Sequence, residues 1–180
     1  MTELIYMDDF DIESCEAVVK SVTQTEDNRT DIEIDKTCFY PRGGGQDWDT
    51  GLIARGESYL TVEEVRLGEN GTVHHIGSLV GELNIGDVVS CSVNQNRRSV
   101  NTRLHSAGHV IDMAIDSLGL DWIAQKGQRY PHLSAVEYEG DWDPERTEEL
   151  RAKIEQTANE IIAKGTDNSL IFMSVEEMQK

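Results

Sequence analysis

The sequence predicts an α+β protein: a small N-terminal β-barrel-like subdomain, residues 1–93, followed by an α+β subdomain, residues 94–180. Two observations lead to this prediction. The first ninety residues hold short apolar or alternating runs separated by glycine turns, which is typical of small barrels and sandwiches. Near Asn94 the apolar spacing changes to steps of three and four, the spacing of an amphipathic helix. The second subdomain is therefore expected to carry a long helix packed on an antiparallel sheet.

The strands of the first subdomain follow from local patterns. Residues 30–35 alternate between polar and apolar side chains, as expected for a strand with one buried face. No helical period interrupts the region before residue 94. The expected strands cover residues 17–22, 30–35, 59–67, 71–76 and 87–93.

The second subdomain is expected to begin with one long helix. Apolar residues recur from Val100 to Leu118 at helical steps, and Gly119 is placed to end the helix. Asp143 and Pro144 then form a helix start, with an N-cap followed by a first-turn proline. The remaining expected elements are strands at 122–124, 135–138 and 169–173, a helix to Gly165, and a final helical turn at 175–180.

The charge of the chain is strongly negative, with 34 acidic and 16 basic residues and a net charge of −18. Such a balance argues against a polyanionic partner such as RNA. However, residues 36–46, 91–111 and 126–136 contain arginines or lysines and no acid. One explanation is chance together with burial of these segments. The other is that the three segments form one site that accepts an anion.

Composition excludes several other classes of protein. No apolar run approaches the ~20 residues of a membrane helix, and the first residues lack the basic start and apolar core of a signal peptide. The three cysteines are an odd number without paired spacing, which indicates a reducing compartment. We therefore expect a cytoplasmic protein with no membrane partner.

A pair of histidines is the first candidate site. His105 and His109 are four residues apart on the predicted long helix, so their rings lie on one side of it. This geometry can offer two nitrogen ligands to zinc, and it can equally belong to two histidines at the edge of the apolar stripe. No Glu follows His105, which excludes a His-Glu-x-x-His peptidase.

A glycine-rich segment, Thr37-Cys-Phe-Tyr-Pro-Arg-Gly-Gly-Gly-Gln46, is the second candidate site. Consecutive glycines let a ligand approach main-chain N–H groups, which together can form an anion nest. A flexible hairpin is the alternative for a bare run of glycines. The flanking aromatic residues and the following Asp47-x-Asp-x-Gly make the motif more specific.

Together these motifs resemble the alanyl-tRNA synthetase editing-domain family, and especially its free-standing AlaX-type trans-editing members. The resemblance covers nearly the whole chain. Further matching segments are residues 73–75, 86–89, 97–98, 125–131, 136–140 and 154–162.

The resemblance implies an aminoacyl-tRNA deacylase that hydrolyses the ester of mischarged Ser-tRNA(Ala), and of Gly-tRNA(Ala), at the tRNA acceptor end. Zinc can polarise such an ester and position a water. His105 and His109 match the zinc ligands of the family helix, and Thr37 matches a residue that contacts the serine hydroxyl. The remaining candidate catalytic residues shape the acyl pocket or line its cleft: Gly43, Gly44, Gly45, Gln46 and Gln128.

Three arginines are candidates for RNA contact. Three arginines of the second acid-free segment precede the paired histidines in the sequence: Arg97, Arg98 and Arg103. Guanidinium groups are common phosphate ligands. We expect these arginines near the mouth of a site that also contains the glycine segment and Gln128.

The sequence departs from the family in its zinc ligands. The family supplies two more from a late Cys-x-x-x-His, and no cysteine here has a histidine four residues on. Two histidines are too few for a well-held zinc. We expect either a truncated chain or one that has lost this half of the site, with weak or no zinc binding.

Two other functions remain open. One is a non-catalytic RNA- or nucleotide-binding remnant of an editing domain that has lost half of its zinc site. The other is a metal-independent small-molecule esterase, for which the sequence shows no Ser-His-Asp triad. Zinc content would separate the first of these from the enzyme.

Overall fold

The computed structural model describes residues 1–165, 167, 169 and 171–178. Its contacts divide the chain into two compact units. The first joins Met1–Gly108 to Ala124–Glu137, and the second joins His109–Ile123 to the described residues from Tyr138 onward. The boundary therefore falls within one continuous helix.

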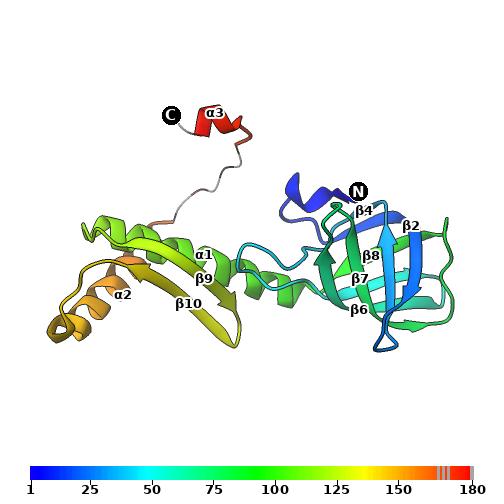
Figure 1. Cartoon of the computed structure of the whole chain (residues 1–180), viewed down its shortest axis with the longest axis horizontal. Helices are drawn as coiled ribbons and strands as arrows, with labels where there is room; N and C mark the ends of the chain where they lie inside the picture. Colours follow the sequence, from blue (N-terminus) through cyan, green and yellow to red (C-terminus); the bar gives the residue numbers. More distant parts are fainter. Residues whose placement is uncertain (166, 168, 170, 179–180) are drawn as a thin grey trace. The chain divides into compact units, whose positions relative to one another are not determined.

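The first unit is built on a closed six-stranded barrel, drawn in blue to green in Figure 1. Its strand order is β2-β3-β7-β6-β5-β8, and every neighbouring pair is antiparallel. The strands are β2 (Ser14–Gln24), β3 (Thr30–Ile34), β5 (Gly51–Arg55), β6 (Ser58–Leu67), β7 (Val73–Val80) and β8 (Val88–Val93). The predicted α+β class and small barrel are confirmed.

Alternation along these strands fills the barrel. In β3 the residues alternate between buried and partly buried, so that Ile32 and Ile34 point into the core. Phe39, Ile53 and Leu60 are also fully buried in the same cluster. The sequence patterns missed β5, which contributes Ile53, because this strand is short and lies between glycine turns.

The cysteines belong to this interior. Cys38 and Cys91 are fully buried, and a hydrogen bond with Cys15 together with burial raises the pKa of both thiols. A protonated, enclosed thiol is a poor nucleophile. Cys38 is thus a packed residue, although it lies beside the glycine segment.

A short parallel pair of strands leads to the glycine segment. β1 (Glu3–Leu4) pairs with β4 (Lys36–Thr37), and a 3₁₀ turn (Ile5–Met7) follows β1. The hydroxyl of Thr2 donates to the carbonyl of Ile34, and it accepts from the N–H of Val73. The N-terminus is thereby tied to β3 and β7.

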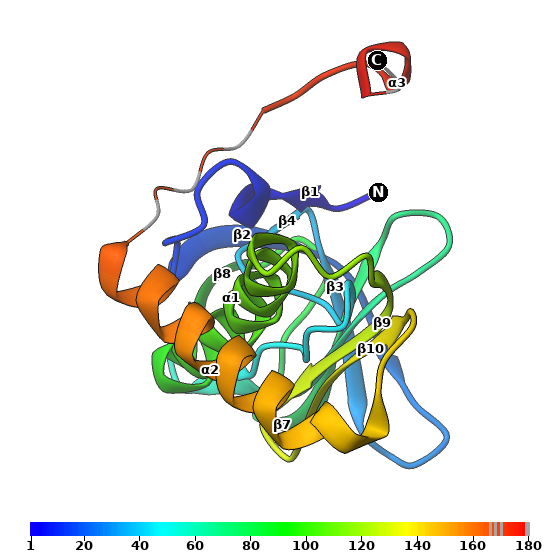
Figure 2. The same ribbon diagram turned by 90° about the vertical axis from the view of Figure 1, so that its left-hand side faces the viewer.

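The long helix is α1 (Gln95–Ser117), close to its predicted limits. Gly119, at φ +65°, follows the helix in the left-handed region that glycine adopts without strain. β9 (Ile123–Tyr130) and β10 (Leu133–Glu139) then form a two-stranded sheet. Figure 2 shows α1 nearly end-on, with β9 and β10 side by side.

The second unit contains α2 (Thr147–Lys164). A 3₁₀ turn (Pro144–Arg146) precedes it, and the Asp143 carboxylate accepts from the N–H of Glu145, as a cap should. α3 (Val175–Met178) is a single turn. The predicted strand at 169–173 is wrong for residues 169 and 171–173, which have no regular structure. Residues 170 and 179–180 lie outside the described residues.

Among the helices that the structure describes, none is both long and apolar enough to cross a bilayer. The division into a β-rich subdomain, residues 1–93, and an α+β subdomain, residues 94–180, stays a prediction.

Candidate functional site

The glycine loop, residues 43–46, is a tight turn closed by its own backbone. The N–H of Gln46 donates to the carbonyl of Gly43 at 2.8 Å, and the reverse bond is 3.3 Å. Gly44 and Gly45 have φ of +56° and +77°, a region that costs other residues about 1–2 kcal/mol. The phenol of Tyr40 donates to the carbonyl of Gly43 and fixes the start of the turn.

The loop packs against β9 more closely than any side chain would allow. The N–H of Arg129 donates to the carbonyl of Gly45 at 2.9 Å. A Cβ built on Gly45 would lie 2.4 Å from the carbonyl oxygen of Gly127. Glycine is therefore required at position 45 for both its conformation and its lack of a side chain.

Gln46 joins the loop to α1. Its Oε1 lies 2.9 Å from Nδ1 of His105, and a Cβ on Gly44 would lie 3.6 Å from Cε1 of the same ring. Because an amide oxygen only accepts hydrogen bonds, Nδ1 of His105 donates to it, and in the neutral ring the lone pair is then on Nε2. The structure thus brings together two motifs that are 59 residues apart.

Arg129 is the cation of this site, and it was absent from the predicted site residues. Its guanidinium lies over two glycines: a Cβ on Gly108 would be 2.3 Å from Nε, and one on Gly127 would be 2.5 Å from Nη1. Nη1 also donates to the carbonyl of Gly44 at 3.4 Å. Nε is buried without a hydrogen-bond partner among the described residues, and no described carboxylate forms an ion pair with Arg129. A signal did exist in the sequence, since residues 126–136 contain no acid.

Gln128 lies next to these residues but does not share their surroundings. It is exposed on β9, whereas Gly127 and Arg129 meet the loop. Side chains alternate along a strand, so Gln128 points to the opposite face. The residue of this segment that contacts the glycine loop is Arg129, and a role for Gln128 in the cleft stays a prediction.

Thr37 is fully buried, and its hydroxyl is committed to a histidine. Oγ1 lies 2.9 Å from Nε2 of His75 and accepts from the N–H of Phe39 at 3.0 Å. Nδ1 of His75 lies 3.0 Å from the carbonyl of Ile32, so Nδ1 carries the proton and Nε2 accepts from Thr37. Burial lowers the pKa of His75 to about 4, which keeps the ring neutral. Contact between Thr37 and a substrate hydroxyl stays a prediction.

Arg97 and Arg98 have intramolecular partners where tRNA phosphates were expected. Arg97 pairs with Asp47 at 2.6 Å, and Arg98 pairs with Asp49 at 2.6 Å. Arg98 also donates to the carbonyl of Cys38, and Asp49 accepts from the N–H of Tyr40. These bonds hold both ends of the glycine segment on α1.

Arg103 is exposed beside a hollow formed by the N-terminal segment and the start of α1. RNA contact by these three arginines remains a prediction, and the ion pairs of Arg97 and Arg98 do not favour it.

His105 and His109 are the zinc ligands that the sequence predicts, and zinc binding by them stays a prediction. His105 and His109 are four residues apart on α1, and Nδ1 of His109 lies 3.4 Å from the carboxylate of Asp112. A carboxylate or amide behind Nδ1 is common for metal-bound histidines, because it directs Nε2 to the metal. No cluster of three or more metal-binding side chains occurs within the described part of the chain. These residues alone therefore do not complete a zinc site.

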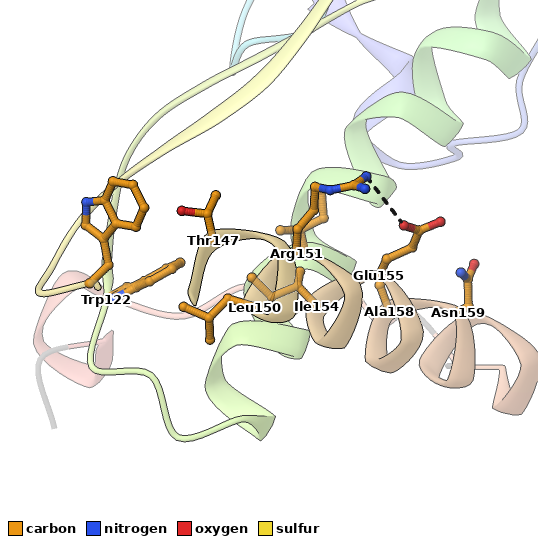
Figure 3. Close-up of a pocket in the computed structure, with 10 residues that line it drawn as sticks. Trp122, Thr147, Leu150, Arg151, Ile154, Glu155, Ala158 and Asn159 are labelled. Carbon is orange, nitrogen blue, oxygen red and sulfur yellow. Dashed lines mark ion pairs between the residues drawn. The ribbon is translucent and has the colours of Figure 1, made fainter. Parts of the chain in front are cut away.

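A separate apolar hollow of about 500 Å³ lies in the second unit. Figure 3 shows it along α2, which supplies Leu150 and Ile154, with Arg151 paired to Glu155. Its lining is mostly apolar, and its residues all belong to the second unit.

Comparison with known proteins gives the class of this protein, which is related to tRNA synthetases. The family model for class II (A) tRNA synthetases matches residues 7–97. The chain is 34% identical to the alanyl-tRNA editing protein AlaX-M of Saccharolobus solfataricus, over 98% of this chain and 71% of that protein. It is 32% identical to AlaX-M of Methanosarcina mazei, over the whole of this chain and 71% of that protein. The chain therefore belongs to the alanyl-tRNA editing family.

Alanine–tRNA ligases are also related to the chain. The ligase of Clostridioides difficile is 30% identical over 92% of this chain, which corresponds to 19% of the ligase. The likeness is thus to one part of a much longer enzyme.

Proposed function

We propose that this protein is a cytosolic trans-editing deacylase that hydrolyses the ester of serine, and also of glycine, mischarged onto tRNA(Ala). Family membership gives the reaction class. The observation that supports a hydrolytic site is the meeting of the glycine loop, the oriented ring of His105 and the unpaired guanidinium of Arg129 in one compact unit.

The reaction needs a stabilised oxyanion. Attack of water on the ester carbonyl develops negative charge on its oxygen, and a preorganised donor in a water-poor site stabilises that charge. Arg129 is such a donor, since its charge is not neutralised by a described carboxylate. The N–H groups of Gly44 and Gly45 are not used in the turn's own bonds and add to the same nest.

The reaction also needs a positioned water. In the tautomer that Gln46 selects, Nε2 of His105 carries a lone pair. That nitrogen can accept a proton from water as a general base, or it can bind a metal. The two roles are exclusive at one nitrogen, and they differ in metal dependence.

We also propose that His105 and His109 bind zinc. When bound, it would supply Lewis acidity, with His105 and His109 as two imidazole ligands. Because two ligands are half of the usual set, we expect weak zinc binding by the described residues. Zinc affinity, measured by competition with a chromogenic chelator, should fall further in His105→Ala and His109→Ala.

Preference for serine has one candidate origin. Thr37 lies six residues before the glycine loop, but its hydroxyl proton is bound by His75. We therefore expect Thr37→Val to lower stability as well as rate, whereas Thr37→Ser retains both.

The test is a panel of aminoacyl-tRNA substrates. Initial hydrolysis rates are measured for Ser-, Gly- and Ala-tRNA(Ala), with Ser-tRNA(Ser) as the control for tRNA identity. The proposal expects fast loss of serine and glycine from tRNA(Ala) and little loss of alanine. Hydrolysis of all three at the spontaneous rate, with intact RNA binding, would instead support a non-catalytic RNA-binding role.

A further inference from the structure

A partly exposed group of rings and arginines borders the glycine loop. We call it the aromatic–arginine surface: Arg42, Trp48, Arg97, Tyr130 and His132. The guanidinium carbon of Arg42 lies 5.2 Å from the ring centre of Tyr130 and 5.9 Å from that of Trp48. Arg97 lies 5.8 Å from the Trp48 ring, and the rings of Tyr130 and His132 stack at 5.9 Å and 13°.

Within the described part of the chain, the guanidinium of Arg42 is held by a ring and not by an acid. Its hydrogen bonds go to the phenol oxygen of Tyr130, at 3.0 and 3.3 Å. No carboxylate pairs with it among the residues that the structure describes, whereas Arg97 is paired with Asp47. Arg42 thus places a cation between two aromatic rings without a direct ion pair to a described carboxylate.

The surface is continuous with the candidate site. Arg42 directly precedes Gly43, the first residue of the glycine loop, and Tyr130 directly follows Arg129. The indole of Trp48 is fixed by donation to the carbonyl of Glu63 at 2.7 Å. A ligand bound at the glycine loop would therefore lie beside Arg42 and the two rings that Arg42 contacts.

We propose that the aromatic–arginine surface binds unpaired nucleotides at the 3′ end of the substrate RNA, and this inference rests on the proposed function. Bases stack on aromatic side chains and on the planar guanidinium of arginine, whatever their sequence. Arg42 also neutralises a phosphate of the same strand. Arg97, already paired with Asp47, holds the Trp48 ring in place.

The binding test uses uncharged RNA, so it does not depend on deacylation. The probes are an acceptor-stem hairpin with its unpaired 3′ tail, the same hairpin without the tail, and one whose tail nucleotides lack bases. Fluorescence anisotropy gives the three dissociation constants. We expect the tail to strengthen binding by about tenfold or more through its bases, which the abasic tail should lose.

Variants locate the tail on this surface. Tyr130→Leu and Arg42→Ala should each weaken binding of the tailed hairpin by about tenfold and leave the tail-less hairpin unchanged. Tyr130→Phe retains the ring and should bind nearly as the wild type does. Arg55→Ala removes an equally exposed guanidinium from β5 and should affect both hairpins alike.

Two results would overturn the inference. One is equal binding of natural and abasic tails by the wild-type protein, which needs no variant to fold. The other is an unchanged tail preference in folded Tyr130→Leu and Arg42→Ala. If deacylation is intact in either case, only this inference fails; if deacylation is absent but tail preference follows the variants, only the proposed activity fails.

Discussion

Nδ1 of His105 lies 2.9 Å from Oε1 of Gln46, so a residue of the glycine loop selects the tautomer of a histidine on α1. Gln46 itself is only 6% exposed, and the turn of residues 43–46 fixes its backbone. The orientation of His105 thus depends on the shape of the loop. Loss of the Gln46 amide should disturb the ring without removing it.

The first prediction concerns this hydrogen bond. Gln46→Leu removes the acceptor at Nδ1 and should lower the deacylation rate about 10–100-fold, the usual range for the partner of a functional histidine. Gln46→Glu keeps an acceptor and adds a charge, which should raise the pKa of His105 and shift the pH–rate profile upward. Rates of both variants are measured from pH 5 to 9. A wild-type profile for Gln46→Leu would show that the contact does not position His105.

The second prediction separates backbone strain from close packing in the glycine loop. Gly45 and Gly56 have φ of +77° and +60°, but only a Cβ on Gly45 meets another atom, 2.4 Å away. Gly56→Ala should therefore cost about 1 kcal/mol and leave activity unchanged. Gly45→Ala should cost more and abolish most activity, because the loop must leave β9.

Urea unfolding and deacylation rates of the two glycine variants give the comparison. Equal losses of stability and activity would mean that the contact with Gly127 is unimportant.

The third prediction concerns the ion pair beneath the loop. Asp49 is fully buried and Arg98 nearly so, and a buried carboxylate without its partner is strongly unfavourable. Arg98→Met should lower the free energy of unfolding by about 3–5 kcal/mol. Adding Asp49→Asn should recover part of this loss, since the amide oxygen still accepts from the N–H of Tyr40.

Arg97→Met is the matched control, because its pair with Asp47 is more exposed and should cost less. Recovery in the double variant, measured by urea unfolding, is the decisive result. A double variant no more stable than Arg98→Met would contradict the buried-charge explanation.

The fourth prediction is a pH dependence of stability. The pKa of buried His75 is lowered to about 4, below its unfolded value of ~6.5, so the unfolded state binds the proton first. The contribution of neutral His75 is complete above pH ~6.5 and is lost as the pH falls towards 4, by up to about 3 kcal/mol. Unfolding in urea at pH 7, 5.5 and 4.5 measures it.

His75→Gln should reduce this acid sensitivity, whereas replacing exposed His132 by Gln should not. The wild-type-minus-variant difference removes the effect of the many carboxylates. An identical pH dependence in His75→Gln and the wild type would rule out His75 as its source.

Much of the fold could be predicted from the sequence because the barrel strands carry local patterns. Residues 30–35 alternate, and the helix that became α1 has a clear period and a glycine stop. The strand predicted at 169–173 was wrong for residues 169 and 171–173. Ile171 and Phe172 are exposed, and an apolar run alone does not supply a strand to pair with.

The site was only partly predictable, for a physical reason. Residue type and spacing identified Gln46 and His105 as candidate site residues. A sequence pattern does not show which distant residues a side chain contacts in the folded protein. Arg97 and Arg98 looked available for phosphate, yet they pair with Asp47 and Asp49, which are some fifty residues away in sequence. Arg129 was overlooked in favour of its neighbour Gln128, because strand alternation at that position could not be assigned without the contact to the glycine loop.

The most direct test of the account is the single-turnover rate of serine release from Ser-tRNA(Ala), with wild-type protein and Arg129→Leu in excess over RNA. The control is Arg55→Leu, which removes an exposed guanidinium from β5. The account predicts release well above the spontaneous rate for the wild type and Arg55→Leu, and about 100-fold slower release for Arg129→Leu, as for the loss of one oxyanion donor. Release at the wild-type rate by folded Arg129→Leu, or no release by the wild type, would contradict it.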